Sequence, residues 1–368
     1  MILIGTDNGI YRWFEGASWP VFHSLQDRSI VDLASPGPGV LVALDRAGQV
    51  FESVNNGQDW RTIPLAEGAG SPTSLAAWGD PPFIVLGTRT QGLARRPVGA
   101  PIPVHHDPKA PVQGSASSWI GRARSLAEGA TALLAPKPEV SRTDRATAKL
   151  AGWTRLGTPA PGKAKQPGVI RAMAVGEGST PVWYAAVRGA GLWRSTDLGV
   201  SWNPCPGLPV DVFAIRTAPK RPGSVYVATS DGCWISSDAG LTWEDRSGGL
   251  ENARYLSAIE VKPGAPDVLL AGAALRGPND FANGPFTGLA FSLYESKDGG
   301  KAWSLVRRGN PDVFENDMIA DLRHDPAAPD NVILALTSGE LWITPNAGAF
   351  WMPLSRQIRA ARKLCPVA

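Results

Sequence analysis

The chain has 368 residues and a formal net charge of +3, and its charged residues are spread along the sequence. It lacks the basic stripe with interleaved aromatic residues that nucleic-acid binding needs, so we expect no nucleic-acid partner. With 41 glycines, 33 prolines and little sustained helical periodicity, the composition favours many short strands joined by turns. The cysteines, Cys205, Cys233 and Cys365, form no CxxC spacing, which argues against a disulfide framework and a structural zinc site.

The N-terminal segment, Met1 to Gly9, is predicted to be a strand that runs into a turn. It lacks the basic segment, long apolar segment and cleavage site of a secretory leader, and we therefore expect a cytoplasmic protein. No apolar stretch approaches the roughly 18 residues that a membrane-spanning helix needs. We expect no insertion into a membrane.

A short motif of the form S-x-D-x-G-x-x-W, which we call a box, recurs along the chain. Residues 195–202, 236–243 and 296–303 match it in full. Residues 53–60 and 344–351 carry Asn in place of Asp, and residues 344–351 also begin with Thr. Asn supports the same turn chemistry as Asp, so we count all five segments as copies of one repeat.

Each box predicts a hairpin turn with a defined role for each residue. The Asp or Asn bonds the backbone across the turn, the Gly adopts a left-handed conformation, and the Trp begins the next strand. The motif resembles the Asp box of BNR-repeat propellers, which are found in sialidases, sortilin and photosystem assembly factors. The resemblance implies that the boxes lie on the outer turn between the third and fourth strands of each blade. We therefore assign a structural rather than a catalytic role to Asn55, Asp197, Asp238, Asp298 and Asn346.

Around each box the same unit of four short strands recurs, which is the pattern of a propeller blade. Residues 182–193 and 225–234, for example, align as second and third strands. Markers of the fourth strand occur at Trp19, Trp60, Ile102, Trp153, Trp202, Trp243, Trp303 and Trp351. They predict an all-β, closed propeller of eight blades. Because residues 98–151 match the repeat poorly, the alternative is seven blades with one long excursion.

The two ends of the chain are predicted to share a blade in a single propeller domain spanning residues 1–368. Residues 358–364 resemble the first strand of other blades, and the N-terminal unit lacks that strand. Pairing of the two would remove the open edges of a linear array. The spacing of 60 residues between Trp243 and Trp303 predicts an insertion loop at 276–290 in the penultimate blade.

Binding residues are expected on the face opposite the boxes, where ligands of such rings bind around the mouth of the channel. Arginine presents a planar fork that suits carboxylate, phosphate or sulfate, so several arginines from different blades predict an anion site. The alternative is that these arginines form salt bridges with Asp7, Asp45 and Asp231. The ligand-binding candidates are Arg46, Arg89, Arg188, Asp231, Arg254, Arg276 and Asp317.

Three residues near this rim are candidates for catalysis: Tyr255, Glu251 and Asp280. A sialidase combines an arginine triad, a tyrosine nucleophile supported by glutamate, and an acid/base aspartate. The chain lacks the F/Y-R-I-P segment that accompanies the first arginine in that family. His105 and His106 would point to opposite faces of a strand, so we expect no metal site, and we expect no cofactor.

These observations predict a non-catalytic scaffold that binds a protein partner, an anionic small molecule or a glycan at the channel rim. The alternative is a glycoside hydrolase or lyase of the BNR type that acts on an acidic sugar.

Overall fold

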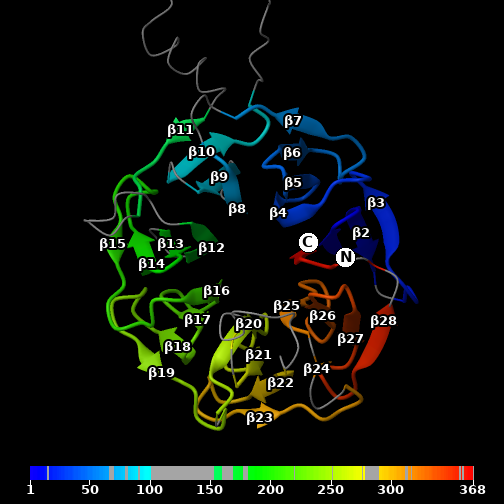
Figure 1. Ribbon diagram of the computed structural model, residues 1–368, viewed down its shortest axis with the longest axis vertical. Helices are drawn as coiled ribbons and strands as arrows, with labels where there is room; N and C mark the ends of the chain where they lie inside the picture. Colours follow the sequence, from blue (N-terminus) through cyan, green and yellow to red (C-terminus); the bar gives the residue numbers. More distant parts are fainter. Residues whose placement is uncertain are drawn as a thin grey trace, which may run out of the picture.

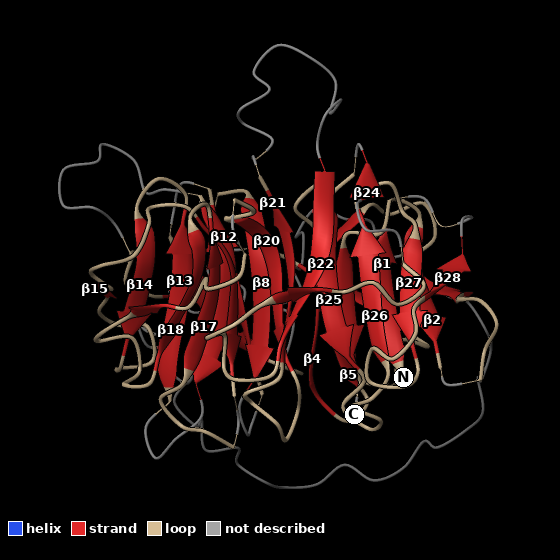
Figure 2. Cartoon of the chain, turned by 90° about the horizontal axis from the view of Figure 1, so that it is seen from below, coloured by secondary structure: helices blue, strands red, loops and turns tan. Residues whose placement is uncertain are grey.

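The computed structural model describes residues 1–14, 16–65, 70–78, 82–89, 92–100, 153–159, 169–176, 181–218, 220–250, 252–275, 277, 290–310, 314–315, 317–355, 358 and 360–367. The described residues form strands and turns and include no helix. Seven sheets stand around a central axis and close into a ring, which is a β-propeller (Figure 1). Seen from the side, the strands run roughly along that axis (Figure 2). The predicted fold class is therefore confirmed.

Each blade has four antiparallel strands that follow one another from the axis to the rim. The innermost strands, from blade 1 to blade 7, are β29 (Lys363–Pro366), β4 (Ile30–Gly37), β8 (Pro72–Trp78), β12 (Ile170–Gly176), β16 (Val212–Thr217), β20 (Tyr255–Val261) and β25 (Ile319–His324). The second strands are β1 (Ile2–Thr6), β5 (Val40–Asp45), β9 (Phe83–Thr88), β13 (Val182–Val187), β17 (Val225–Thr229), β21 (Leu269–Ala274) and β26 (Val332–Leu336).

The third and fourth strands complete the blades in the same order. The third strands are β2 (Gly9–Trp13), β6 (Val50–Ser53), β10 (Leu93–Pro97), β14 (Gly191–Ser195), β18 (Gly232–Ser236), β22 (Ala290–Ser296) and β27 (Leu341–Thr344). The outer strands are β3 (Val21–Ser24), β7 (Arg61–Ile63), β11 (Thr154–Arg155), β15 (Asn203–Pro204), β19 (Glu244–Asp245), β23 (Ser304–Leu305) and β28 (Met352–Ser355). A further short strand, β24 (Phe314–Glu315), pairs with β22 in blade 6.

The blade count is seven, the alternative that we considered, and the preferred count of eight was wrong. The reason lies in blade 3, where β11 pairs with β10: Ala94 lies opposite Arg155, and Arg95 lies opposite Thr154. Trp153 therefore marks the outer strand of blade 3 and not a blade of its own. The extra marker, Ile102, falls outside the described residues.

The two ends of the chain share blade 1, as predicted. β29 pairs with β1 in an antiparallel register that places Leu364 opposite Ile4. The closing strand begins at Lys363, near the end of the segment 358–364 that the sequence indicated. The predicted insertion at 276–290 separates β21 from β22 and falls outside the described residues except for Gly277 and Ala290, so it stays a prediction.

Apolar packing between neighbouring blades explains why the second strands are almost continuously apolar. β17 and β26 are buried along their whole length, because each lies between two neighbouring sheets. Among the described residues, seven apolar clusters form, one at each junction between adjacent blades. The approach is close enough that a Cβ at Gly5 would meet the side chain of Ile30 in the next blade at 2.9 Å.

Candidate binding site at the channel mouth

The innermost strands line a cavity of about 220 Å³ on the axis of the ring. Six of these strands carry a β-bulge near their start, which leaves one residue without a partner in the second strand. The bulged residues are Val31, Thr73, Arg171, Phe213, Ser257 and Ala320, and all of them line the cavity. In blade 1, Arg362 directly precedes the inner strand and also lines the cavity. The repeat thus places one variable side chain per blade at the channel.

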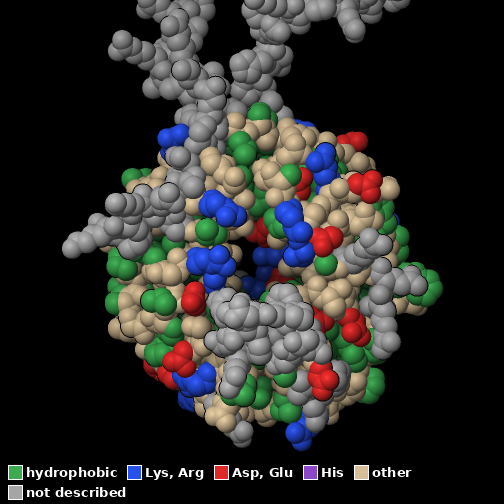
Figure 3. Space-filling view, viewed as in Figure 1, with side chains coloured by type: hydrophobic (Ala, Val, Ile, Leu, Met, Phe, Trp, Pro, Cys, Tyr) green, Lys and Arg blue, Asp and Glu red, His purple; other side chains and the backbone are tan. Residues whose placement is uncertain are grey.

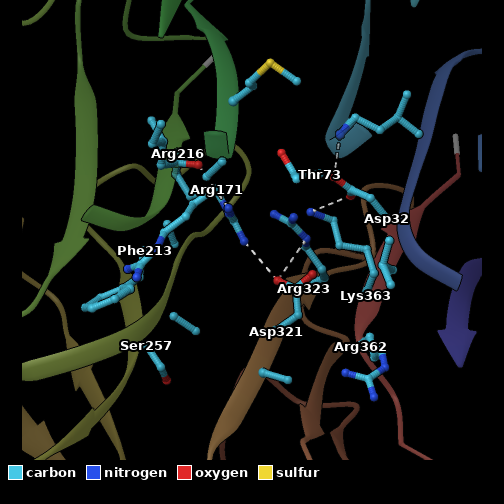
Figure 4. A pocket seen from close by; sticks show the side chains of 18 residues that line it. Asp32, Thr73, Arg171, Phe213, Arg216, Ser257, Asp321, Arg323, Arg362 and Lys363 are labelled. Carbon is cyan, nitrogen blue, oxygen red and sulfur yellow. Dashed lines mark hydrogen bonds and ion pairs between the residues drawn. The ribbon is translucent and has the colours of Figure 1, made fainter. Parts of the chain in front are cut away.

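Two arginines and two carboxylates form a balanced network further along the inner strands. Arg216 bonds Glu260 (Nε to Oε2, 2.7 Å) and Asp321 (Nη2 to Oδ1, 3.1 Å). Arg323 lies 3.3 Å from the Glu260 carboxylate and 3.5 Å from that of Asp321, and Figure 4 shows Asp321 beside Arg323. Burial opposes ionisation of Asp321, but the charges of Arg323, Lys363 and Arg216 outweigh it and lower the pKa. These charges hold the inner strands together.

Lys363 and Asp32 form a second internal pair, with Nζ 3.0 Å from Oδ1 (Figure 4). The carboxylate of Asp32 also accepts hydrogen bonds from the backbone N–H of Leu33 (3.0 Å) and Leu75 (2.8 Å). Arg362 is held by Asp7, to which it donates from Nε (2.8 Å) and Nη2 (3.0 Å). That bidentate contact is the main reason that the pKa of Asp7 is lowered to about 2.

Arg171 is the cation of the cavity that is least well compensated. Its Nη1 lies 3.4 Å from the Asp211 carboxylate, and its guanidinium carbon lies 5.0 Å from the centre of the Phe213 ring. Burial lowers the pKa of Arg171, and the positive charge of Arg188 acts in the same direction. Arg171 and Arg188 are therefore like charges close to one another, and an anion between them would relieve the repulsion.

Three predicted arginines occupy one repeated position at the mouth, directly after the second strands of blades 2, 3 and 4. In each, the backbone N–H donates to the residue before the inner strand: Arg46 to Ser29 (2.7 Å), Arg89 to Ser71 (2.9 Å) and Arg188 to Val169 (2.9 Å). All three side chains are exposed, and Figure 3 shows Lys and Arg side chains gathering around the central hollow.

The three rim arginines differ in their partners. Arg46 lies 3.4 Å from the Asp7 carboxylate. Within the described part of the chain, neither Arg89 nor Arg188 forms an ion pair. The salt-bridge alternative thus describes Arg46, and among the described residues it leaves the exposed guanidinium groups of Arg89 and Arg188 without a carboxylate.

Three further predicted binding residues, Asp231, Arg254 and Asp317, stabilise turns in this structure. Asp231 pairs with Arg254, which also bonds Asp245 at 2.9 Å. Asp317 is buried and accepts hydrogen bonds from the backbone N–H of Met318 (2.8 Å) and Ser338 (3.1 Å). Their roles in ligand binding stay predictions.

The catalytic candidates are not assembled by the described residues. Tyr255 is half-buried, with its ring centre 4.8 Å from that of Phe213 and 6.1 Å from that of Phe291. Glu251 and Asp280 lie outside the described residues, as do Arg276, His105 and His106. Among the described side chains, no group of three His, Cys, Asp or Glu residues is placed to hold a metal ion.

The five boxes form turns of one geometry between the third and fourth strands. In each, the Asp or Asn side-chain oxygen accepts a hydrogen bond from the backbone N–H four residues later, at 2.9 to 3.0 Å. The box glycines adopt positive φ values between 79° and 85°. Because successive strands are antiparallel, these turns lie on the face opposite the rim arginines.

The cavity residues were not predicted, although the sequence contains their pattern. The bulged position is the second residue of a repeated tetrapeptide that starts with an apolar residue or proline and ends with Leu, Ile or Met. Its copies are Ile30–Leu33, Pro72–Leu75, Ile170–Met173, Val212–Ile215, Leu256–Ile259 and Ile319–Leu322. Alternation of strand side chains predicts the wrong face for this residue, because a bulge shifts the register by one.

The three cysteines are buried and form no disulfide. Burial raises the pKa of the Cys205 thiol to about 12, so it is not a thiolate near neutral pH. Among the described residues there is no helix that would cross a membrane.

No protein-family model matches the chain, and no curated protein sequence does. Solved propeller structures are similar in fold. The GH74 xyloglucanase of Xanthomonas campestris is 18% identical over 99% of this chain and 52% of its own, with a TM-score of 0.57. The GH74 enzyme of Niastella koreensis is 12% identical over 95% of this chain and 51% of its own, with a TM-score of 0.63.

A third similar structure, YCF48 bound to a D1 peptide, is 15% identical over 96% of this chain and 92% of its own, with a TM-score of 0.53. The chain spans about half the length of the two GH74 structures and most of the YCF48 structure. At these identities the likeness shows the propeller fold, and the function has to be argued from the site.

Proposed function

We propose that this propeller is a non-catalytic binding scaffold that holds an acidic segment of a protein partner at the channel mouth, over blades 2 to 4. The observation that carries the proposal is the repeated position occupied by Arg46, Arg89 and Arg188. Exposed guanidinium groups around a concave mouth focus a positive potential, and each presents a fork that fits a carboxylate. The positive charge of Arg188 lowers the pKa of Arg171, so a negative charge bound near the two would stabilise both cations.

An extended segment fits this arrangement better than a small anion. The arginines come from three successive blades, so several carboxylates spaced along a chain are needed to satisfy them together. The fold supports the same reading by analogy: one of the similar propellers is YCF48 bound to a D1 peptide, and the boxes resemble those of assembly-factor propellers. An anionic small molecule or glycan is the variant in which the Arg171–Arg188 pair alone binds.

A peptide titration tests the proposal. We expect a fluorescent peptide with alternating Glu and Gly to bind the full chain, and its Gln counterpart to bind at least tenfold more weakly. Arg89→Gln and Arg188→Gln are each expected to weaken binding of the Glu peptide about tenfold, or about 1.4 kcal/mol. Rising ionic strength weakens it further, because exposed charges are screened.

The matched control is Lys220→Gln, which removes an exposed positive charge from the turn between β16 and β17 on the opposite face. It should leave the affinity unchanged. Equal weakening by the control, or equal affinity for the Glu and Gln peptides, would reject the channel mouth as an acidic-peptide site.

The second candidate is a BNR-type glycoside hydrolase or lyase that acts on an acidic sugar. What favours it is the occurrence of the same fold in GH74 enzymes, together with arginines at the mouth that suit a sugar carboxylate. A panel of fluorogenic glycosides that includes a sialoside separates the two functions. Turnover that is lost in Tyr255→Phe would establish the hydrolase, and inactivity across the panel would remove it.

A further inference from the structure

The residue directly before the outer strand is a tryptophan in blades 2 to 7, and each of these tryptophans packs against the protein. In blades 2 and 4 the indole N–H closes the box turn, since Trp60 donates to Gly57 O (3.1 Å) and Trp202 to Gly199 O (3.2 Å). Those of blades 3, 6 and 7 are buried, and that of blade 5 is half-buried. In blade 1 that position is occupied by the buried Pro20, and the tryptophan one residue earlier, Trp19, is 66% exposed.

A second tryptophan explains why Trp19 points outward. Blade 1 has no box, and the turn before β3 is closed by Trp13, whose indole N–H donates to Ala17 O at 3.0 Å. Trp13 is only 3% exposed and fills the space beneath the turn. Trp19 is therefore not needed for the turn. An exposed tryptophan without a structural task is the residue type most enriched at the centres of protein interfaces.

Trp19 belongs to an exposed group that we call the apolar edge: Phe14, Trp19, Val21 and Phe22. Their exposed fractions are 47%, 66%, 43% and 40%. Phe22 also packs edge-on against Tyr11, with ring centres 5.5 Å apart, which orients the group. The apolar edge lies on the outside of blade 1, away from the channel mouth.

β3, which carries Val21 and Phe22 of the apolar edge, has an unprotected backbone edge among the described strands. Among the described strands, β3 pairs only with β2, so its outer N–H and C=O groups face solvent. Proteins protect such edges with charged residues or proline. Five of the other six outer strands contain one of these, whereas β3 reads Val-Phe-His-Ser. The sixth, β23, has only two residues.

We propose that β3 pairs antiparallel with β3 of a second copy of this chain across a two-fold axis. An antiparallel edge is self-complementary, so one strand supplies both sides of a closed dimer. The strand carries no Asp, Glu, Lys or Arg that would repel its own copy, and the ring of His23 donates from Nε2 to Asn56 O at 3.0 Å. Joined in this way, the two blades form one continuous sheet whose apolar edges cover each other.

The exposed area of the apolar edge sets the expected affinity of the dimer. Its three aromatic side chains together leave on the order of 300 Å² exposed per copy. Two copies thus bury on the order of 600 Å² of aromatic surface, below the ~1,200 to 2,000 Å² of a stable interface. The dimer is therefore weak and reversible, with a dissociation constant in the micromolar range or above, and it forms at high concentration.

Sedimentation equilibrium of the full chain from about 5 to 500 μM tests the dimer. The wild type is expected to move from monomer towards dimer across this range. Trp19→Ser should weaken association at least tenfold with little change in Tm, because Trp19 makes little contact with its own chain. The control Leu241→Ser removes a 59% exposed apolar side chain from blade 5 and should associate like the wild type.

Hydrogen exchange of residues 19–25 gives a second readout. Amides of β3 should gain protection at high concentration in the wild type and in Leu241→Ser, and not in Trp19→Ser. A chain that stays monomeric throughout would overturn the proposal and leave the edge to a different partner. So would a dimer without protection of β3, or one that Trp19→Ser does not weaken. Because the apolar edge is distant from the channel mouth, the peptide titration is unaffected by either result.

Discussion

At one repeated position of the blades the side chain varies, while the backbone keeps the same hydrogen bond. The residue after the second strand is Arg46, Arg89 and Arg188 in blades 2 to 4, Ser230 in blade 5 and Thr337 in blade 7. In each blade it makes the same backbone hydrogen bond, at 2.7 to 3.0 Å. Because the backbone supplies that bond, the side chain is free to serve a ligand. The proposed binding of an acidic segment rests on the cationic side chains at three of these positions.

His324 is a buried titratable residue whose chemistry can be assigned at the same scale. Its Nδ1 lies 2.6 Å from the carbonyl oxygen of Pro329, and since a carbonyl only accepts, Nδ1 carries the proton. Nε2 is buried and has no hydrogen-bond partner among the described protein groups. It borders a cavity of about 210 Å³ between blades 6 and 7, which is also lined by Glu295 and Lys262. The ring is therefore held in its neutral form.

We predict that His324 makes the protein less stable in mild acid. Burial lowers the pKa of His324 below its ordinary value of 6.5, so as the pH falls the unfolded chain takes up the proton first. The free energy of unfolding should decrease below pH 6.5, by up to about 1.4 kcal/mol per pH unit from this group, until the folded pKa is reached. Urea unfolding between pH 4.5 and 7.5 measures the slope.

The matched variant is His324→Asn, whose amide keeps a donor for Pro329 and does not titrate. Its stability should depend less steeply on pH than that of the wild type between pH 6.5 and 5. Parallel curves for the two proteins would mean that His324 is not the group responsible, since the acidic residues are common to both.

At the scale of the element, the box turns connect the third and fourth strands of a blade and tolerate the replacement of Asp by Asn. In the turn after β18, the Asp238 carboxylate accepts hydrogen bonds from the backbone N–H of Leu241 (3.0 Å) and Thr242 (2.9 Å). It also accepts from the hydroxyl groups of Ser236 and Thr242. The turns at Asn55 and Asn346 make the backbone bond with an amide oxygen. One acceptor oxygen at this position is therefore the minimum requirement.

We predict that Asp238→Ala lowers Tm by roughly 2 to 5 °C, because it leaves the N–H groups of the turn without their acceptor. Asp238→Asn should lower Tm by less, since the amide oxygen replaces the oxygen that bonds Thr242. Differential scanning calorimetry measures both. An Asn variant as unstable as the Ala variant would show that charge, and not the acceptor, holds the turn.

The sequence was sufficient to predict the strands, the box turns and the closing strand, because each depends on local chemistry that repeats. It was sufficient for the rim arginines for the same reason: they follow a recognisable second strand. It was not sufficient for the cavity. Arg171, Arg216, Arg323 and Lys363 line one cavity from different blades. The bulge at Arg171, and the bulges before Arg216 and Arg323, change the side that simple alternation predicts.

At the scale of the whole molecule, blade 3 explains the error in blade number. Marker spacing cannot tell a degenerate blade from an insertion within a blade, because both lengthen the interval between tryptophans. The decision comes from pairing: β10 finds its outer partner in β11, after residue 152. Hydrogen bonds hold both ends of the connection between β10 and β11. Trp153 donates its indole N–H to Pro64 O (2.9 Å), and Arg96 donates to Ala100 O (2.6 Å).

The buried pair of Arg96 and Glu52 attaches the end of blade 3 to blade 2. Both side chains are fully buried and lie 3.4 Å apart, and Arg61 bonds the same carboxylate at 2.9 Å. All three belong to the propeller itself. The ring therefore contains, within its described residues, the contacts that hold both ends of the long connection.

We predict, therefore, that residues 101–152 are dispensable for the ring. Replacing them with a Gly/Ser linker of about six residues should leave a folded propeller, because seven residues, 196–202, connect the corresponding strands β14 and β15. Its Tm should change by less than about 5 °C, and its affinity for the Glu peptide should match that of the parent chain, since the rim arginines are untouched. Circular dichroism melting and the peptide titration measure the two.

Leaving out the segment together with Glu52→Ala should unfold blade 3, because Arg96 is then buried without its carboxylate. A linker variant that fails to fold on its own would show that the segment supplies packing that blade 3 needs.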